Sequence, residues 1–386
     1  MKLGLPFNFR CFTHFDKKPR LGLSHSSYTW IEGEKGLKIN WSASFQIAAV
    51  YVGTVVGAGF ATGREIVEFF SRFGFIGFFG ILITGYLLIY FGSKLMRMAV
   101  QVGANSYQEL NEYLFGKILG RAINVLTLVM LLGVCAVMLS GAGAVFEEQL
   151  NISKSVGVFV TIGLSFLVMM VGIKGLFIVN TIVVPTMVFF SLVLLITTIK
   201  LPHFTETLVA IPFAEDGWKA VVAPFSYAAL NLALSQAVLV PVAAEIKDDQ
   251  TIKWGGILGG AALTFILLCN HAILIMLPHL ESYQIPMAVI VKNLAGGIYW
   301  IYVFIIYGEI FTSVIGNVFG LERQIKAFSK IPSMVITSVI FIISYFISRI
   351  DYGTLLSYLY PIFGYVSLAF IIILWMKPLK NVNKGD

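Results

Sequence analysis

Long apolar runs recur along this sequence from Ser42 almost to its C-terminus. Runs of about 18 to 25 apolar residues have the length with which an α-helix crosses a bilayer. A transmembrane β-barrel would instead show segments of about ten residues that alternate in polarity. With 58% hydrophobic and only 12% charged residues, the chain carries more apolar surface than a soluble domain can bury. The sequence therefore predicts an all-α protein that crosses the lipid bilayer repeatedly.

The predicted spans, about ten in number, are separated by short polar stretches or by stretches that carry glycine and proline. They lie at 42–72, 75–98, 122–148, 156–173, 176–199, 218–246, 254–278, 298–325, 332–348 and 353–376. Most lysines and arginines fall at the segment ends that one threading places on a single side, the cytoplasm. Both termini are then cytoplasmic in a multi-pass protein of the cell membrane. Residues 1–41 are predicted to be a disordered polar leader and 379–386 a cytoplasmic tail.

The spans divide into two sets of five, at 42–199 and 218–378, joined by an extracellular linker at 200–217. In both sets the first span is long and carries polar residues or glycines, and an amphipathic stretch follows the second span. An odd number of spans in each set inverts the second set relative to the first. This pattern is typical of transporters built from inverted repeats, although coincidence in a ten-helix protein is the alternative.

The first span contains the segment GTVVGAGFATGREIVEFF, residues 53–70, with four glycines in eleven residues. Each glycine destabilises a helix by about 1 kcal/mol relative to alanine. Thr62 and Glu65 then fit a capping box, which marks a new helix start. We therefore predict two half-helices, 42–56 and 63–72, with a break at Gly57, Ala58 and Gly59. The alternative is one continuous helix over 42–61 whose glycines pack against a neighbour.

A broken helix is tolerated at membrane depth only where its backbone is buried in protein or lines a watery cavity. The break therefore predicts a binding cavity, with carbonyl groups suited to a cation and amides suited to a carboxylate. The sixth span carries polar residues at its centre, and a second break is expected there at 228–231. Tyr227 would act as an aromatic lid and Asn231 would face the site, or these polar groups join neighbouring helices by hydrogen bonds.

In the eighth span Glu309, Thr312, Ser313, Gly316 and Gly320 share one helix face. Their oxygens suit a sodium ion shared with the first span, whereas the blander interpretation has both hydroxyl groups bonding back to their own helix. The carboxyl group of Glu309, near mid-span, would carry a proton, accompany the cation or stay neutral and hydrogen-bonded.

An ion pair between Arg64 and Asp351 is expected to close the cavity from outside, unless both are solvated surface charges. The sequence holds no HExxH, no phosphate-binding loop and no evident pair of protease carboxylates, so no enzyme and no cofactor are predicted. The net charge of +7 follows from the basic helix ends, and no signature of nucleic-acid binding is present.

The stretch VGAGFATGREIVEFF at 56–70 resembles the YkvI-like membrane proteins. More broadly, GTVVGAGF, the hydroxyls of Thr312 and Ser313 and the five-plus-five plan resemble the LeuT-fold transporters of the amino acid/polyamine/organocation superfamily. This resemblance implies a sodium ion held by the carbonyls of Gly53 and Val56 and by those two hydroxyls. It also implies a solute that lies against residues Gly57, Ala58, Gly59, Tyr227 and Asn231. Phe60 stands where a second-sodium asparagine occurs, so one sodium ion is expected.

The sequence thus predicts a secondary active transporter that carries a small organic solute, such as an amino acid, with sodium by alternating access. Three alternatives stay open. The protein would bind a solute as a sensor without moving it, as germinant-receptor-like subunits do, would couple transport to protons through Glu309, or would conduct ions as a channel.

Overall fold

The computed structural model describes residues 39–211, 217–283, 285–294, 296–350 and 352–379. These residues form fifteen α-helices and three short 3-10 helices, without a strand among them. The predicted leader at 1–41 and tail at 379–386 fall almost wholly outside the described residues. So do Asp351 and part of the predicted linker, 212–216.

Eight described helices are long and apolar enough to cross a membrane. Together with α14, which is shorter, and the interrupted first span, they correspond to the ten predicted spans, and the predicted fold class is confirmed. The spans are α1–α3 (Trp41–Val55, Ala58–Ala61, Arg64–Phe69), α4 (Phe75–Val102), α6 (Lys117–Leu150), α7 (Lys154–Val171), α8 (Ile173–Ile199), α10 (Gly217–Ile246), α11 (Asp249–Leu274), α13 (Tyr299–Phe328), α14 (Ser333–Ser348) and α15 (Tyr352–Met376). The shorter elements between them are η2 (Ser71–Phe73), α5 (Tyr107–Phe115), α9 (Phe204–Val209), η3 (Leu280–Ser282), α12 (Pro286–Leu294) and η4 (Gly296–Ile298).

The first span is broken where its glycines predict. Helix α1 ends before Val56, whose backbone is extended, and Gly57 is extended as well before the single turn of α2. Gly63 then takes a left-handed conformation at φ +82° and starts α3. A single helix over 42–61 is therefore excluded.

The predicted capping box at the start of α3 is wrong, although the helix does restart there. Gly63 rather than Thr62 occupies the N-cap position, and Gly63 has no side chain to cap α3. The hydroxyl of Thr62 accepts from the amide of Arg64 at 3.4 Å and lies 3.0 Å from the hydroxyl of Tyr352, but the described residues show neither of the two capping-box bonds between Thr62 and Glu65. The carboxyl group of Glu65 is thereby left for another role.

The predicted break in the sixth span is also wrong, because α10 runs without interruption from Gly217 to Ile246. Pro224 and Pro241 each remove a backbone donor inside this helix, but they do not end it. The residues between the two prolines are rich in alanine and leucine, which favour helix, and contain no glycine. Most of them are also buried, so packing supports the helix along its length.

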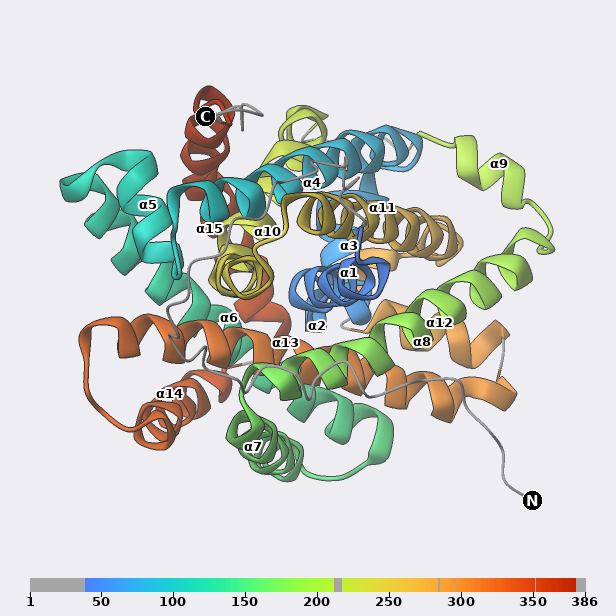
Figure 1. The fold of residues 1–386 in the computed structure, drawn as a ribbon. Coiled ribbons are helices and arrows are strands. Elements are labelled where there is room, and N and C mark those ends of the chain that lie inside the picture. The colour runs from blue at the N-terminus through green and yellow to red at the C-terminus, as the bar shows by residue number, and fades with distance from the viewer. Residues whose placement is uncertain (1–38, 212–216, 284, 295, 351, 380–386) are drawn as a thin grey trace, which may run out of the picture. The chain divides into compact units, whose positions relative to one another are not determined.

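The spans pack in two groups with the broken helix at their boundary. Helix α4 packs against α10 and α11, and α1 packs against the same two helices. Helix α6 packs against α7, α13 and α14, while α8 and α15 contact members of both groups. Figure 1 shows α1 in the centre, between α11 and α13, with α5 at one end of the helices and α9 and α12 at the other. These two ends are called the α5 end and the α12 end below.

Candidate functional site

A cavity of about 20 Å³ lies at the break of the first span. This is space for about one water molecule, so it admits an ion or one small polar group but no whole amino acid. Its walls come from both helix groups, and its polar lining combines a carboxyl group, two amides and three hydroxyls. The lining residues are Thr54, Val55, Gly57, Glu65, Val134, Met138, Leu230, Asn231, Leu234, Ser313, Asn317 and Tyr360.

The glycines at the break let other side chains approach the backbone closely. A Cβ atom on Gly57 would lie 2.8 Å from the sulfur of Met138 and 3.1 Å from the hydroxyl oxygen of Ser313. The amide of Ala58 donates to the same sulfur at 2.9 Å. On Gly59 a Cβ atom would lie 2.6 Å from Oε2 of Glu65. Glycine at both positions therefore keeps α6, α13 and the Glu65 carboxyl group against the broken backbone.

Glu65 is a site residue that sequence reasoning assigned to the capping box. Its side chain is buried, lines the cavity and forms no ion pair among the described residues. Tyr227 and Asn231 are the polar side chains that face it, yet Oε1 of Glu65 and the Tyr227 hydroxyl both lack a hydrogen-bond partner in the described part of the chain. A buried carboxylate without a counter-charge is costly, so this group either holds a proton or receives a cation. The sequence signal that could have identified Glu65 as a site residue is its position two residues after Gly63, directly behind the glycine-rich break.

Oxygen atoms of α1 and α13 meet beside the break. The hydroxyl of Thr312 donates to the carbonyl of Glu309 at 2.8 Å and lies 3.4 Å from the carbonyl oxygen of Gly53. Thr312 therefore bonds back to its own helix, as one interpretation of the sequence has it, and also approaches the first span. The 3.4 Å separation is that of a long hydrogen bond from Thr312 to Gly53, and it is also the spacing of two ligands at about 2.4 Å from one small cation at a right angle.

The other two groups predicted as sodium ligands are the carbonyl of Val56 and the hydroxyl of Ser313. Among the described residues, no backbone amide donates to the carbonyls of Gly53 or Val56, because α1 has ended. Ser313 faces the cavity rather than the Gly53 carbonyl, and its hydroxyl oxygen is 3.4 Å from the side-chain nitrogen of Asn317. The structure thus brings Gly53 and Thr312 together and sets Ser313 beside Gly57.

Asn180 of α8 is a polar residue at this place that the sequence did not single out. Its side-chain nitrogen donates to the carbonyl of Leu176 at 2.8 Å, while its buried oxygen Oδ1 has no partner among the described residues. A Cβ atom built on Gly53 would lie only 1.6 Å from that oxygen. Asn180 therefore presents an unpaired oxygen directly against the end of α1.

The backbone carbonyl of Glu309 accepts from the Thr312 hydroxyl, and the Glu309 side chain is fully buried. Both carboxyl oxygens lack a hydrogen-bond partner among the described residues. Arg64 does not reach into the cavity: its guanidinium donates to the carbonyls of Glu281 and Tyr283, the latter at 3.1 Å. Since Asp351 lies outside the described residues, its predicted pair with Arg64 stays a prediction.

The break is closed toward the α12 end by direct contacts. The amide of Met287 in α12 donates to the carbonyl of Thr62 at 3.0 Å. The ring of Tyr227 packs edge-on against Phe69 and Phe70, with centroid distances of 5.2 and 5.0 Å. Tyr227, the predicted lid, therefore lies in an aromatic layer between the cavity and this end.

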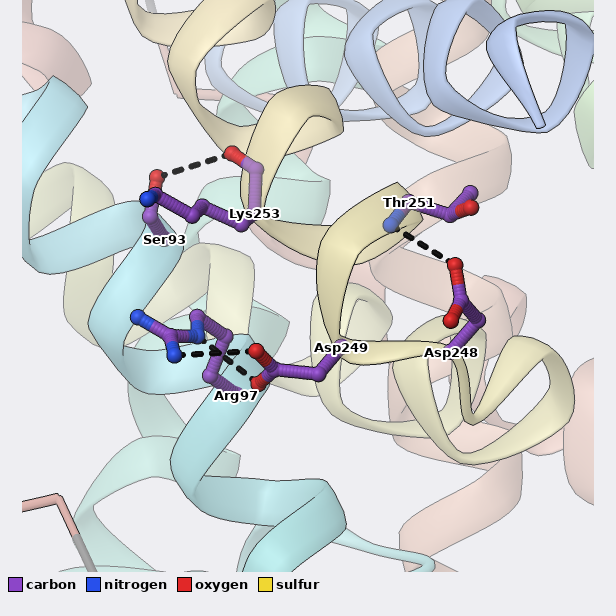
Figure 2. A network of polar contacts seen from close by, with 6 residues as sticks. All are labelled: Ser93, Arg97, Asp248, Asp249, Thr251 and Lys253. Carbon is purple, nitrogen blue, oxygen red and sulfur yellow. Dashed lines mark hydrogen bonds and ion pairs between the residues drawn. The ribbon is translucent and has the colours of Figure 1, made fainter. Parts of the chain in front are cut away.

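At the α5 end, polar contacts join α4 to α11. Figure 2 shows Arg97 of α4 and Asp249 of α11 in a two-pronged ion pair, with nitrogen to oxygen distances of 2.8 and 2.9 Å. The hydroxyl of Ser93 also donates to the carbonyl of Lys253, at 3.4 Å. Because paired hydrogen bonds between a guanidinium and a carboxylate fix geometry, these contacts hold the two helices in one register.

The start of α11 is also tied to α1. Asp248 caps α11 by accepting from the amide of Thr251 at 2.8 Å (Figure 2). The hydroxyl of Ser44 donates to the carbonyl of Thr251 at 2.9 Å, and the amide of Asn40 donates to the Thr251 hydroxyl at 3.2 Å. Helices α1, α4 and α11 are therefore cross-linked at the α5 end.

Comparisons with known proteins agree with a membrane protein of this architecture. No protein-family model matches the chain. The chain has the fold of a manganese transporter from Eremococcus coleocola: one crystal structure, with a bound aromatic bis-isothiourea compound, matches at a TM-score of 0.66 and 15% identity over 89% of this chain and 80% of that one. A mutant of that transporter matches at a TM-score of 0.65 and 14% identity, over 87% and 78%.

Two proteins of Bacillus subtilis (strain 168) are related in sequence. The uncharacterized protein YyaD is 22% identical over 342 residues, which cover 88% of this chain and 98% of YyaD. The uncharacterized membrane protein YkvI is 50% identical over 333 residues, which cover 86% of this chain and 95% of YkvI. Half of the residues are thus shared over nearly the whole of both proteins, and the chain belongs to the family of the membrane protein YkvI.

Proposed function

We propose that this protein is a secondary active transporter that moves a small organic solute, such as an amino acid, together with a sodium ion. The observation that carries the proposal is the broken first span, where the Gly53 carbonyl has no backbone donor among the described residues and meets a hydroxyl of α13 across the boundary of the two helix groups. The likeness to a solved transporter supports the same class of protein. Manganese is the substrate named for that transporter and is not part of this proposal.

The sodium ion is proposed to bind between α1 and α13. The carbonyls of Gly53 and Val56 and the hydroxyls of Thr312 and Ser313 are its proposed ligands, and Asn180 supplies a further oxygen at the same place. An ion bound there holds α1 to the second helix group. It thus favours whichever arrangement keeps the two groups together at this point, since a ligand shifts a conformational equilibrium by its differential affinity.

The solute is proposed to bind where the backbone of the first span is broken. Amides at Ala58 and Gly59 suit a carboxylate, because the first amides of a helix have no acceptor within it. Glu65, whose carboxyl group lies close to Gly59 and lines the cavity, suits an ammonium group, and Asn231 adds a neutral polar contact. These groups offer partners for both charges of an amino acid, but the cavity of about 20 Å³ would have to widen as the helix groups tilt before it holds a whole one. Tyr227 would close the site from the α12 end.

Alternating access requires the two helix groups to tilt against each other. Helices α1, α4 and α11 are cross-linked at the α5 end, so we infer that they move as one body with α10. From the basic helix ends we propose that the α5 end faces the cytoplasm and that the membrane is the cell membrane. In this orientation the aromatic layer and α12 close the site from the outside.

Proton coupling is the second candidate, and the two buried carboxyl groups favour it. Glu65 and Glu309 are both without an ion-pair partner among the described residues. A group of this kind at membrane depth is a functional candidate, because its charged form is costly. In this version a proton on Glu309 or Glu65 takes the part of the sodium ion.

The proposal is tested by thermal unfolding of the purified protein in sodium, in potassium and with manganese added as a competing cation. A sodium concentration of 100 times its dissociation constant stabilises the folded state by about 2.7 kcal/mol. Replacing both Thr312 and Ser313 by alanine should abolish the sodium effect. The matched control replaces Thr186 and Ser338, two exposed hydroxyls that bond back to their own helices. A full sodium response in the first variant would refute the cation site.

Transport itself is tested by counterflow in proteoliposomes with a panel of amino acids. A transporter exchanges labelled for unlabelled solute across the bilayer. A sensing subunit would bind the solute without exchange, and a channel would conduct ions without saturable uptake. Exchange driven by a proton gradient and indifferent to sodium would favour the second candidate.

A further inference from the structure

A second cavity lies at the α5 end of α13. Its volume of about 220 Å³ is far larger than that of the first. It is bounded by the last turn of α7, the last turns of α13 and the first turns of α14. Met169 and Phe319 supply much of its apolar wall, and the polar wall consists of Glu322, Arg323, Lys326, Ser333 and Thr337. We propose that this cavity binds the phosphate headgroup of an anionic membrane lipid.

Two cationic side chains of α13 form one side of the cavity. The guanidinium carbon of Arg323 lies 5.2 Å from the ring centroid of Phe319, and the amine of Lys326 lies 3.6 Å from a carboxyl oxygen of Glu322. The Lys326 amine also donates to the hydroxyl of Ser333. Because the single carboxylate offsets only one of the two cations, the cavity keeps one positive charge, which matches a phosphodiester.

The opposite side of the cavity is the N-terminus of α14. Pro332 at the N-cap provides no side-chain cap, and in the described part of the chain the amides of Ser333 and Met334 have no acceptor. Helix N-termini carry partial positive charge and bind phosphate oxygens through their free amides. Both residues line the same cavity as Arg323 and Lys326.

Thr337 is an independent indication that a ligand completes this site. It lies one turn after Ser333 on the same helix face, lines the cavity and is 1% exposed. Its hydroxyl has no hydrogen-bond partner among the described residues. A buried hydroxyl left unpaired costs about 1 to 3 kcal/mol, and a phosphate oxygen in the cavity would remove that cost.

The surroundings favour a lipid over a free phosphate ion. Beside the cavity, Met170 and Val171 of α7 and Val335 of α14 are at least half exposed, as expected of side chains that face acyl chains. The cavity lies at the ends of these helices, which is the depth of the headgroups. Basic pockets between transmembrane helices at this depth bind anionic headgroups.

The experiment measures lipid binding to the purified full-length protein by native mass spectrometry and by thermal shift. The probes are phosphatidylglycerol, phosphatidylcholine and inorganic phosphate. We expect phosphatidylglycerol to bind and stabilise the protein, and the double variant Arg323→Gln/Lys326→Gln to lose at least tenfold in affinity. The matched control is Lys117→Gln/Arg121→Gln, which removes the same charge from exposed positions of α6 at the same end.

A second variant separates specific binding from general charge attraction. Thr337→Val keeps the shape and charge of the cavity and should weaken phosphatidylglycerol binding by roughly fivefold through one lost hydrogen bond. Equal binding of phosphatidylcholine, or an unchanged affinity in both cavity variants, would overturn the proposal. If inorganic phosphate alone gives the same thermal shift as phosphatidylglycerol, the cavity binds a free anion and the lipid proposal is wrong.

Discussion

Replacing Gly53 by alanine is the sharpest test of how α1 meets α8. The added methyl group would lie 1.6 Å from Oδ1 of Asn180, 2.8 Å from its Cγ and 3.3 Å from a methyl group of Val184. Ordinary contact begins near 3.4 Å, so the methyl group and Oδ1 must separate by about 1.8 Å. Asn180 cannot swing aside freely, because its nitrogen is bonded to the carbonyl of Leu176.

The expected destabilisation follows from the two ways of relieving this clash. Moving the helices apart is overpacking, which costs about 1 to 3 kcal/mol. Rotating Asn180 breaks one buried hydrogen bond, which costs about 1 to 3 kcal/mol when a partner is left unpaired. Either route lowers the free energy of unfolding by about 1 to 3 kcal/mol, and a loss of 1 to 2 kcal/mol alone changes the folded to unfolded ratio by about 5- to 30-fold.

The assay is equilibrium unfolding of the purified protein in mixed micelles, with a double-mutant cycle. Asn180→Ala removes the clashing atoms, so the double variant Gly53→Ala/Asn180→Ala should be less destabilised than the sum of the two single variants, by about 0.5 to 3 kcal/mol. The matched control is Gly163→Ala in α7, where an added Cβ meets no atom within 4 Å. Additive effects in the cycle, or a Gly53→Ala variant as stable as the control, would refute this packing.

Three further outcomes are expected. Glu65→Gln keeps the shape of the side chain and removes the need to bury a charge or bind a proton there, so it should leave the protein at least as stable. The variant should also weaken binding of amino acids, measured by thermal shift, and unchanged binding would exclude Glu65 from the solute site. Asp249→Asn breaks the partly exposed pair with Arg97, so it should lower the transport rate and change the free energy of unfolding by about 1 kcal/mol or less. Exchanging the two charges should restore most of the lost rate. If the exchange does not restore transport, the pair is not what couples the two helices. Arg64→Gln should release the segment before α12 and speed the labelling of Thr62→Cys by a thiol reagent from the α12 end; equal labelling rates would contradict the closure described there.

The amino-acid sequence predicted the spans well because a span is recognised from a continuous run of apolar residues, without knowledge of distant contacts. Ten apolar stretches have helix length, and the described helices begin and end within a few residues of most of the predicted ends. The break of the first span was equally predictable, since glycines weaken the helix itself. The sixth span shows the limit: polar residues at its centre suggested a break, but strong helix formers and burial keep α10 intact.

The roles of individual side chains were less predictable because they depend on direction and on distant partners. Glu65 fits a local capping pattern, yet the left-handed turn at Gly63 sends it to the cavity. Asn180 lies more than 120 residues from Gly53 in the chain, and only the packing of α8 on α1 brings the two together. Thr312 bonds back to its own helix and also lies within 3.4 Å of the Gly53 carbonyl oxygen, while its role as a sodium ligand stays a prediction.

The thioether of Met138 has a consequence for how a solute would enter. It accepts the amide of Ala58, but sulfur is a weak acceptor and its side chain is flexible. An incoming carboxylate oxygen would form a shorter and stronger bond with the same amide. Met138 would therefore keep the Ala58 amide hydrogen-bonded until a solute carboxylate replaces its sulfur as the acceptor.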